Sequence, residues 1–407
     1  MARKLKRDLT MEEQLARGPV DLPFLMLVLM LTGIGVVMVF SASFATAFYD
    51  AKVAKNDPTY YFMRQLLFAV AGVAVMYVTS RINYQSFRWM SVFALGISIL
   101  LLILVIPFGF GRAPVGAQRW IQIGPVNFQP SEVAKLGVVL YFAARLSKRN
   151  TEKPRRLNPR SLLSGPLGVL QRIGFLELVP YILILGVIAG LMLLEPHMSG
   201  TILILVGGAA VLFAAGIKLY WFIIGGAGVA GGLWFIITST DYMASRINLW
   251  KDPWNDGMNG LGKGFQTIQS LYAIGSGGLL GLGLGKSRQK FLYLPEPEND
   301  FIFSIVCEEL GLVGATVVLI LFALLIIRGY WIAIHARDRF GALLVVGFTT
   351  LLAVQVFLNI AVVTNFIPTT GISLPFFSYG GTALMIQLLE MGVILSVSRQ
   401  IPAPKQG

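Results

Sequence analysis

The chain has 407 residues, of which 56% are hydrophobic and only 13% are charged. Soluble domains carry about 25% charged residues, so this composition excludes a soluble globular protein and indicates a polytopic membrane protein. The single cysteine, Cys307, excludes an intrachain disulfide framework. The net charge of +13 is more typical of basic cytoplasmic loops than of nucleic-acid binding, so no nucleic acid is expected as a partner.

The chain begins with a polar, basic stretch, MARKLKRDLTMEEQLARGPVDL, that precedes any apolar run. It lacks the short apolar core and small-residue cleavage site of a removable signal peptide. The first apolar segment is therefore expected to remain in the membrane, and residues 1–22 are predicted to form a basic cytoplasmic tail. Residues 400–407 are predicted to form a second cytoplasmic tail.

Ten segments are apolar and approach the length of about 20 residues that crossing a bilayer requires. Backbone groups in lipid must hydrogen-bond internally, so each segment is predicted to be a helix. The segments cover residues 23–45, 61–80, 89–107, 131–147, 177–194, 200–216, 219–239, 301–328, 341–366 and 381–398. The predicted fold is an all-α polytopic membrane protein. Its ten-helix membrane domain covers residues 23–399, with a large outer loop, residues 240–300, between spans seven and eight.

The distribution of Lys and Arg predicts the orientation. Most of the 33 basic residues fall in tails and loops that share one side when the spans alternate, above all in RLSKRNTEKPRRLNPR, residues 145–160. Basic loops stay on the cytoplasmic side, so both termini are predicted to be cytoplasmic and the 240–300 loop external. A loop of this length is usually functional.

Within this loop, GLGLGKS at residues 281–287 has the appearance of a phosphate-binding loop. Three residues separate its first glycine from the GK pair, whereas the nucleoside-triphosphate motif needs four, so nucleotide binding is not expected. Two interpretations stay open. The glycines form a re-entrant turn that allows close backbone approach, or such a turn lies beside a bound lipid.

The connection between spans three and four reads GAQRWIQIGPVNFQPSEVAKL, residues 116–136. Ser131 and Glu132 can cap the fourth span. Lys135 lies about one turn inside that span, where a charge is costly and usually functional, and it can pair with Glu132 three residues earlier. Arg119 and Lys135 are therefore predicted to be cationic groups near an anionic lipid headgroup.

Two further segments interrupt the apolar pattern. PTTGISLPFFSYGGT, residues 368–382, is either a tight re-entrant connection or a backbone-rich wall of a polar cavity. EPHMSGT, residues 195–201, contains His197, one of only two histidines. The sequence shows no Cys or His cluster with zinc-ligand spacing, and no serine has a plausible histidine partner for a catalytic triad.

Several carboxylates gather in FLYLPEPENDFIFSIVCEELG, residues 291–311. Asp300 begins span eight, where it can either cap the helix or serve a site. Glu308 would lie about 80° around the helix and about 12 Å deeper, and Glu309 is nearly opposite. Glu308 and Glu309 are therefore predicted to satisfy polar groups between helices rather than to act with Asp300.

The sequence resembles the SEDS family (shape, elongation, division and sporulation) of bacterial peptidoglycan glycosyltransferases. The resemblance rests on RWIQIGPVNFQPSE, on the block from LGKGFQTIQ to VCEELG, and on PTTGISLPFFSYGG, and it covers nearly the whole chain. LLEMGVILSVSR and KSRQKFLYLPEPENDFIF are more similar to the division branch (FtsW-like) than to the elongation branch (RodA-like). Many members carry an acid where this chain has His197, so no catalytic role is assigned to that residue.

The resemblance implies polymerisation of lipid II, an undecaprenyl-pyrophosphate-linked disaccharide peptide, on the outer face of the cytoplasmic membrane. The essential aspartate of the family falls on Asp300, the expected general base. A divalent cation, with Mg²⁺ the expected ion, or Lys and Arg side chains would neutralise the pyrophosphate. Glu296 and Glu298 are expected to hold that metal or to shape the entrance to the site. The other residues expected to bind substrate are Arg119, Gln129, Glu132, Lys135, Lys286, Arg288, Lys290 and Ser378.

The resemblance also implies a class B penicillin-binding protein, a transpeptidase, as partner. Two alternatives to a division polymerase within the family are an elongation polymerase and a flippase that moves lipid II unchanged. A flippase often has internal repeats, and none is convincing between the two halves of this chain. A third alternative is a scaffold without catalytic activity, whose basic tails bind cytoplasmic partners or anionic lipid.

Overall fold

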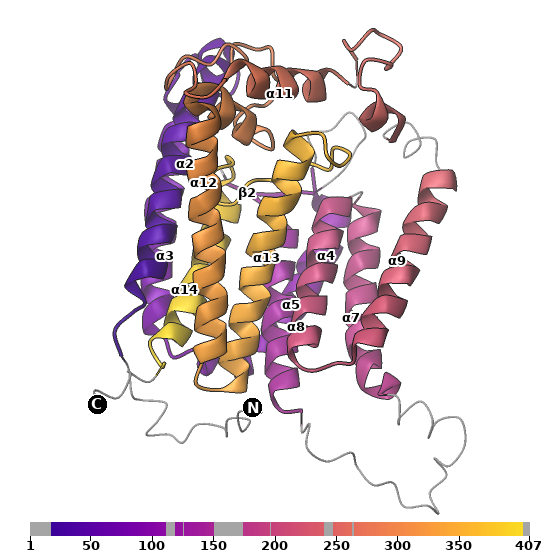
Figure 1. Cartoon of the computed structure of the whole chain (residues 1–407). Helices are drawn as coiled ribbons and strands as arrows, with labels where there is room; N and C mark the ends of the chain where they lie inside the picture. The colour runs from indigo at the N-terminus through magenta and orange to yellow at the C-terminus, as the bar shows by residue number, and fades with distance from the viewer. Residues whose placement is uncertain are drawn as a thin grey trace, which may run out of the picture.

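The computed structural model describes residues 18–110, 119–124, 126–149, 174–195, 197–239, 247–262 and 264–401. Each of the ten segments predicted to span the membrane contains one long helix, which confirms the all-α fold class. These helices are α2 (Leu22–Tyr49), α3 (Tyr60–Arg81), α4 (Ser86–Phe108), α5 (Pro130–Ser147), α7 (Phe175–Leu194), α8 (Met198–Ala214), α9 (Leu219–Ser239), α12 (Ile302–His335), α13 (Arg339–Val363) and α14 (Gly381–Ser398). Figure 1 shows them side by side as a bundle, with the shorter helix α11 (Phe265–Ser276) lying across one end.

Seven of the helices in the described part of the chain are long and apolar enough to cross a membrane: α2, α3, α4, α7, α12, α13 and α14. The other three depart from that pattern for identifiable reasons. Helix α8 is apolar but has only 17 residues, and the apolar stretch described for α9, Leu219–Gly232, is also short. Helix α5 carries charged side chains, Glu132, Lys135 and Arg145. The protein is a multi-pass helical membrane protein.

Helix α13 lies in the middle of the bundle, where it packs against α5, α8, α12 and α14. Its buried positions are nearly all apolar, but the run is interrupted by Gln355 and Asn359, which lie four residues apart on one helical face. Helix α14 packs along α3, and α4 packs along α5. Helix α9 stands at the edge of the bundle (Figure 1).

A small hairpin that was not predicted precedes α5. Strand β1 (Ile121–Ile123) pairs antiparallel with β2 (Val126–Phe128), and Phe110 forms an isolated bridge with Trp120. The turn contains Gly124 at φ +60°, a conformation that glycine adopts without steric cost. The hairpin ends at Gln129, directly before α5, so it fixes where that helix enters the bundle.

Helix α12 is broken at Gly311, whose backbone is not helical (φ 67°, ψ −171°). The freed carbonyls of Glu308 and Glu309 accept hydrogen bonds from the amides of Leu282 and Gly283. The amides of Leu312 and Val313 donate instead to the carbonyls of Gly278 and Leu279. The glycine-rich segment therefore enters the hydrogen-bond ladder of the helix.

Glycine is required for this insertion. A Cβ on Gly281 would lie 2.2 Å from the carbonyl oxygen of Glu309, and one on Gly277 would lie 2.0 Å from that of Cys307. These contacts support the interpretation of residues 277–285 as a re-entrant turn whose glycines allow close backbone approach.

Candidate active site

A polar cavity of about 260 Å³ opens at the end of the bundle where α5, α8 and α14 begin. Its walls come from the β1–β2 hairpin, the first turns of α5 and α8, residues 296–300, and residues 371–387. Charged and amide side chains gather in it: Arg64, Arg119, Asn127, Gln129, Glu132, Lys135, Glu296, Asn299, Asp300, Gln355 and Gln387. Such a concentration of polar groups at one end of an apolar bundle marks the cavity as the candidate site.

Asp300 lies directly before α12, on a backbone held from two sides. The amide nitrogen of Asn359 on α13 donates to the carbonyl oxygens of Asp300 (2.8 Å) and Ile372 (2.7 Å). Gly371 adopts φ +71°, and a Cβ there would lie 3.3 Å from Asp300 Oδ2. One side chain on α13 therefore fixes the aspartate segment and the 368–380 segment relative to each other.

Ser378 makes a second connection between the same two segments. Its hydroxyl donates to the carbonyl oxygen of Asn299 (2.8 Å) and accepts from the amide of Leu374 (2.7 Å). The amide of Tyr379 donates to the carbonyl of Glu298 (2.8 Å). The segment 368–380, for which two interpretations were open, is thus a backbone-rich wall of a polar cavity.

The Asp300 carboxyl is partly buried and lies near Glu296 and Arg119. Burial is the main cause that raises its pKa from 3.8 to about 6; the Glu296 charge raises it further, and the Arg119 guanidinium opposes the shift. A carboxyl with a pKa near 6 is ionised at neutral pH and still accepts a proton readily. This is the property that a general base needs.

Lys135, near the start of α5, is 5% exposed, and its ammonium group lies 2.8 Å from Glu132 Oε2 and 3.2 Å from Gln355 Oε1. The predicted pairing of Glu132 with Lys135 is present. Both residues line the cavity. An anionic ligand entering the cavity would therefore meet an ammonium group that is already oriented by a carboxylate and an amide.

His197 is the N-cap residue of α8 and is 6% exposed. Its ring lines the cavity, and Nδ1 has no hydrogen-bond partner among the residues that the structure describes. Burial, with the charges of Arg119 and Lys135, lowers its pKa to about 3, so the imidazole is neutral. No role was assigned to His197 from its sequence context, but the structure places it in the wall of the cavity.

The predicted site residues divide into two groups. The cavity brings together Arg119, Gln129, Glu132, Lys135, Glu296, Asp300 and Ser378. It is not lined by Lys286, Arg288, Lys290 or Glu298. Glu298 is buried, and its Oε2 accepts from the Thr46 hydroxyl at 3.4 Å.

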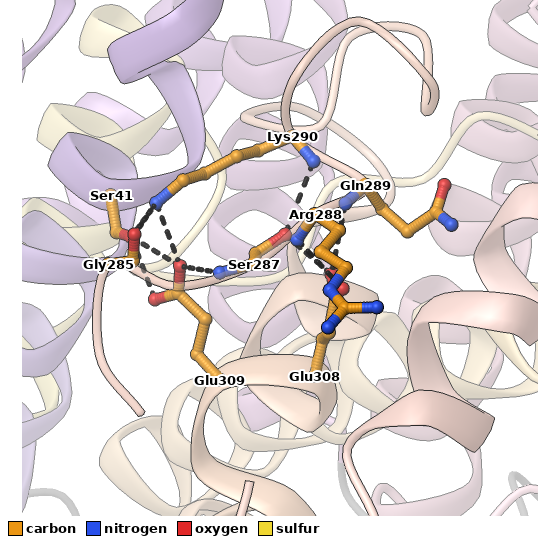
Figure 2. Close-up of polar contacts among 8 residues, drawn as sticks. All are labelled: Ser41, Gly285, Ser287, Arg288, Gln289, Lys290, Glu308 and Glu309. Carbon is orange, nitrogen blue, oxygen red and sulfur yellow. Dashed lines mark hydrogen bonds and ion pairs between the residues drawn. The ribbon is translucent and has the colours of Figure 1, made fainter. Parts of the chain in front are cut away.

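Lys290 corrects the expectation that it binds substrate. It is 2% exposed, and its ammonium group donates to Glu309 Oε1 (3.0 Å), Ser41 Oγ (3.2 Å) and the Gly285 carbonyl (2.7 Å). These contacts use its hydrogen-bonding capacity inside the protein (Figure 2). The physical reason is that residues 285–290 fold back onto α12 instead of facing the cavity.

Figure 2 shows the whole of this second cluster, hereafter the closed cluster: Ser41, Gly285, Ser287, Arg288, Gln289, Lys290, Glu308 and Glu309. Glu308 accepts from the Ser287 hydroxyl and from the amides of Arg288 and Gln289. Both carboxylate oxygens of Glu309 lie 2.7 Å from the Ser41 hydroxyl. The prediction that Glu308 and Glu309 satisfy buried polar groups is confirmed.

The described residues contain no cluster of three or more His, Cys, Asp or Glu side chains that could hold a metal ion. Of the two carboxylates predicted to bind metal, Glu296 lines the cavity and Glu298 does not. Mg²⁺ commonly uses one or two carboxylates together with substrate phosphates. The donor set therefore fits an ion carried in with a substrate but not a protein-made cage.

Residues on α13 were missed by the sequence analysis, although a signal was present. The side-chain oxygen of Gln355 accepts a hydrogen bond from Lys135, and the side-chain nitrogen of Gln355 donates to the Ser373 carbonyl at 3.1 Å. The side-chain nitrogen of Asn359 donates a hydrogen bond to the backbone carbonyl of Asp300. Both interrupt an apolar span at a spacing of four residues, and polar groups at membrane depth usually serve a function.

The fold and the cavity define a class: a multi-pass α-helical membrane protein with a charged pocket at one end of its bundle. A family model described as cell cycle protein, for FtsW, RodA and SpoVE, matches residues 22–402, and the chain belongs to this family. The resemblance to the SEDS family is thereby confirmed.

Similar proteins match over almost their full length. Stage V sporulation protein E of Bacillus subtilis (strain 168) is 41% identical over 381 residues, 93% of this chain and 97% of the relative. A probable peptidoglycan glycosyltransferase FtsW of Geobacter sulfurreducens is 40% identical over 384 residues, 94% of this chain and 95% of the relative.

Solved structures are similar as well. A chain from a peptidoglycan synthase complex, solved in work on the structural coordination of polymerization and crosslinking, has a TM-score of 0.72 and 28% identity, covering 93% of this chain and 98% of that one. The rod shape determining protein RodA of Thermus thermophilus has a TM-score of 0.64 and 26% identity, covering 95% and 98%.

Proposed function

We propose that this protein is a peptidoglycan glycosyltransferase that polymerises lipid II, with Asp300 as general base. The observation that carries the proposal is the position of Asp300, with a pKa raised to about 6, in the same cavity as the cationic residues Arg119 and Lys135. A base and cations that line the same polar pocket suit a reaction in which a hydroxyl attacks and a pyrophosphate departs. The names of the relatives support the same activity.

In the proposed reaction, the Asp300 carboxylate takes the proton of the acceptor 4-hydroxyl, on a terminal N-acetylglucosamine. The hydroxyl oxygen bonds to the anomeric carbon of the donor with inversion. The bond from that carbon to the pyrophosphate oxygen breaks, and undecaprenyl pyrophosphate leaves with the electron pair. Because pyrophosphate is a good leaving group, no second acid is required.

Arg119 and Lys135 are assigned to the charge that develops on the pyrophosphate. Glu132 and Gln355 orient Lys135, while Asn359 and Ser378 hold the segment that carries Asp300. Gln129 and Glu296 are assigned to substrate contacts at the mouth of the cavity. A Mg²⁺ ion, when bound, would be held by Glu296 and the substrate pyrophosphate and would neutralise the leaving group.

The proposed site opens on the outer face of the cytoplasmic membrane, and both termini are cytoplasmic. The concentration of Lys and Arg in the loops opposite the cavity supports this orientation. A class B penicillin-binding protein is the proposed partner. Support comes from the similarity to a chain of a synthase complex that joins polymerization to crosslinking. The proposed process is cell division, and relatives named FtsW support it.

The test is polymerisation of labelled lipid II by the purified full-length protein, with and without the transpeptidase. Asp300→Asn is expected to lower the rate by about 10²–10⁴-fold, because it removes the base without changing shape. Its unfolding temperature is expected to stay at or above that of the wild type. The matched control is Asp57→Asn, in the exposed α2–α3 loop, which should polymerise normally.

Glycan chains of wild-type length from Asp300→Asn would overturn the assignment of the base. A protein that makes no glycan under any condition, but moves lipid II unchanged across liposomes, would be a flippase. A cell that elongates normally but cannot divide when the protein is depleted would support division over the RodA-type role.

A further inference from the structure

A second cavity, of about 330 Å³, lies at the opposite end of the bundle from Asp300, where α5 ends and α7 begins. Figure 1 shows α5 and α7 reaching this end of the molecule. The last turn of α5 contributes Arg145, the residues directly after it contribute Lys148 and Arg149, and the first turns of α7 contribute Glu177 and Tyr181. We call this second cavity the basic cavity. The proposed reaction does not involve it.

The basic cavity has an excess of positive charge. Arg149 is paired, since its guanidinium lies 2.8 Å and 3.0 Å from Glu177 Oε2. Arg145 and Lys148 are exposed and have no hydrogen bond or ion pair within the described residues. Cations at the C-terminal end of a helix are favoured by its dipole, which explains their presence on α5 without a ligand.

Tyr181 is 8% exposed, yet it lines the basic cavity. Its ring is fixed edge-on against Phe142, with the ring centroids 5.0 Å apart. No hydrogen bond of its hydroxyl is formed with the described residues. The hydroxyl oxygen is not among the fully buried atoms that lack a partner in the described part of the chain, so it opens onto the cavity. A tyrosine with a packed ring and an open hydroxyl presents a fixed hydrogen-bond donor to a ligand in the cavity.

The basic cavity also continues onto an apolar surface. Leu176 lines it and is 36% exposed, and farther along α7 Leu183 and Val187 are 62% and 50% exposed. In a membrane these side chains face hydrocarbon. A ligand that is anionic at one end and apolar along its length would match both parts, whereas a free anion would match only one.

We propose that the basic cavity binds the phosphate group of an anionic phospholipid. The phosphate lies between Arg145 and Lys148, and the Tyr181 hydroxyl donates to a phosphate oxygen. The acyl chains follow the exposed face of α7. Basic pockets between membrane helices recognise anionic headgroups by this combination of charge and hydrocarbon contact.

The test measures binding of short-chain phosphatidylglycerol to the full-length protein in detergent, with phosphatidylcholine and inorganic phosphate as further probes. Phosphatidylglycerol is expected to bind more tightly than phosphatidylcholine. Arg145→Gln is expected to weaken its binding about fivefold, since one cation near an anionic headgroup contributes about that much. Tyr181→Phe removes the donor and keeps the ring, and should weaken binding about threefold.

The matched control is Arg81→Gln, an exposed arginine at the last residue of α3, at the same end of the bundle. It removes one charge outside the basic cavity and should leave the dissociation constant unchanged. Should Arg145→Gln fail to fold, Lys148→Gln and Tyr181→Phe test the same contacts. Equal affinity in all variants, or equal binding of both lipids, would overturn the proposal. So would inorganic phosphate that displaces the lipid at equal concentration, because the hydrocarbon part would then contribute nothing.

Discussion

The N-terminal end of α12 lies close to two groups of charged residues with opposite properties. In the closed cluster, Glu308 and Glu309 are 0% and 1% exposed, and all four of their carboxylate oxygens accept hydrogen bonds. In the cavity, Asp300 is only partly buried and its carboxyl faces open space. Carboxylates a few residues apart on one segment can therefore have different roles. Those whose oxygens are fully hydrogen-bonded stabilise the fold, and the one that faces the cavity is available for a reaction.

The largest effect that tests this contrast is expected in the closed cluster. Lys290→Met leaves the Glu309 charge buried without its cation and is expected to lower the free energy of unfolding by about 3–5 kcal/mol. Chemical or thermal unfolding in detergent measures this. The matched control is Lys286→Met in the same loop, where the side chain is exposed and the change should stay within about 0.5 kcal/mol.

A double variant, Lys290→Met with Glu309→Gln, removes both charges together. It should recover much of the stability that Lys290→Met alone loses, because no uncompensated charge remains. A double variant as unstable as the sum of the two single variants would show that the pair is not coupled, and the closed cluster would lose its defining property.

The substitution in the cavity that corresponds to Lys290→Met in the closed cluster is Lys135→Met. Removing one group that stabilises transition-state charge is expected to lower the polymerisation rate about 10²–10³-fold. The loss of stability should be smaller than for Lys290→Met, because Glu132 lies at the cavity wall and is 7% exposed, whereas Glu309 is 1% exposed. A Lys135→Met protein that is unstable but fully active per folded molecule would place Lys135 with the closed cluster.

The smallest effect concerns pH. Since Asp300 must be ionised to act as base, kcat/KM for polymerisation should rise with pH and level off above a pKa of about 6. Glu296→Gln removes a negative charge that raises this pKa and should move the rising limb to lower pH. Arg119→Gln removes a positive charge that lowers it and should move the limb to higher pH. A limb that both variants leave unmoved would assign the titration to another group.

Hydropathy located each long helix of the described residues in advance, because the bilayer imposes length and apolarity on each span separately. The role of Glu308 and Glu309 was also predictable, since helical angle and rise are local quantities. The misassignment of Lys290 has the opposite cause. In the sequence it stands beside Lys286 and Arg288 in a polar loop, and only the packing of that loop on α12 and Ser41 decides its partner.

The cavity was partly predictable. Arg119, Lys135 and Asp300 stood out as charges at the ends of apolar segments. Asn359 and His197 did not, because their importance depends on which segments meet: Asn359 contacts Asp300, 59 residues away. The β1–β2 hairpin was also missed, since strands of three residues give too little alternation to recognise.

The interruption of α12 at Gly311 has a consequence for motion. The amides of Leu282, Gly283, Leu312 and Val313 all donate across the junction between the re-entrant segment and the helix. Because these four bonds join the same two stretches of backbone, we expect the four amides to exchange their hydrogens with solvent as one cooperative unit. In that case the re-entrant segment and the start of α12 would move as a single unit, with Asp300 directly preceding it in the chain.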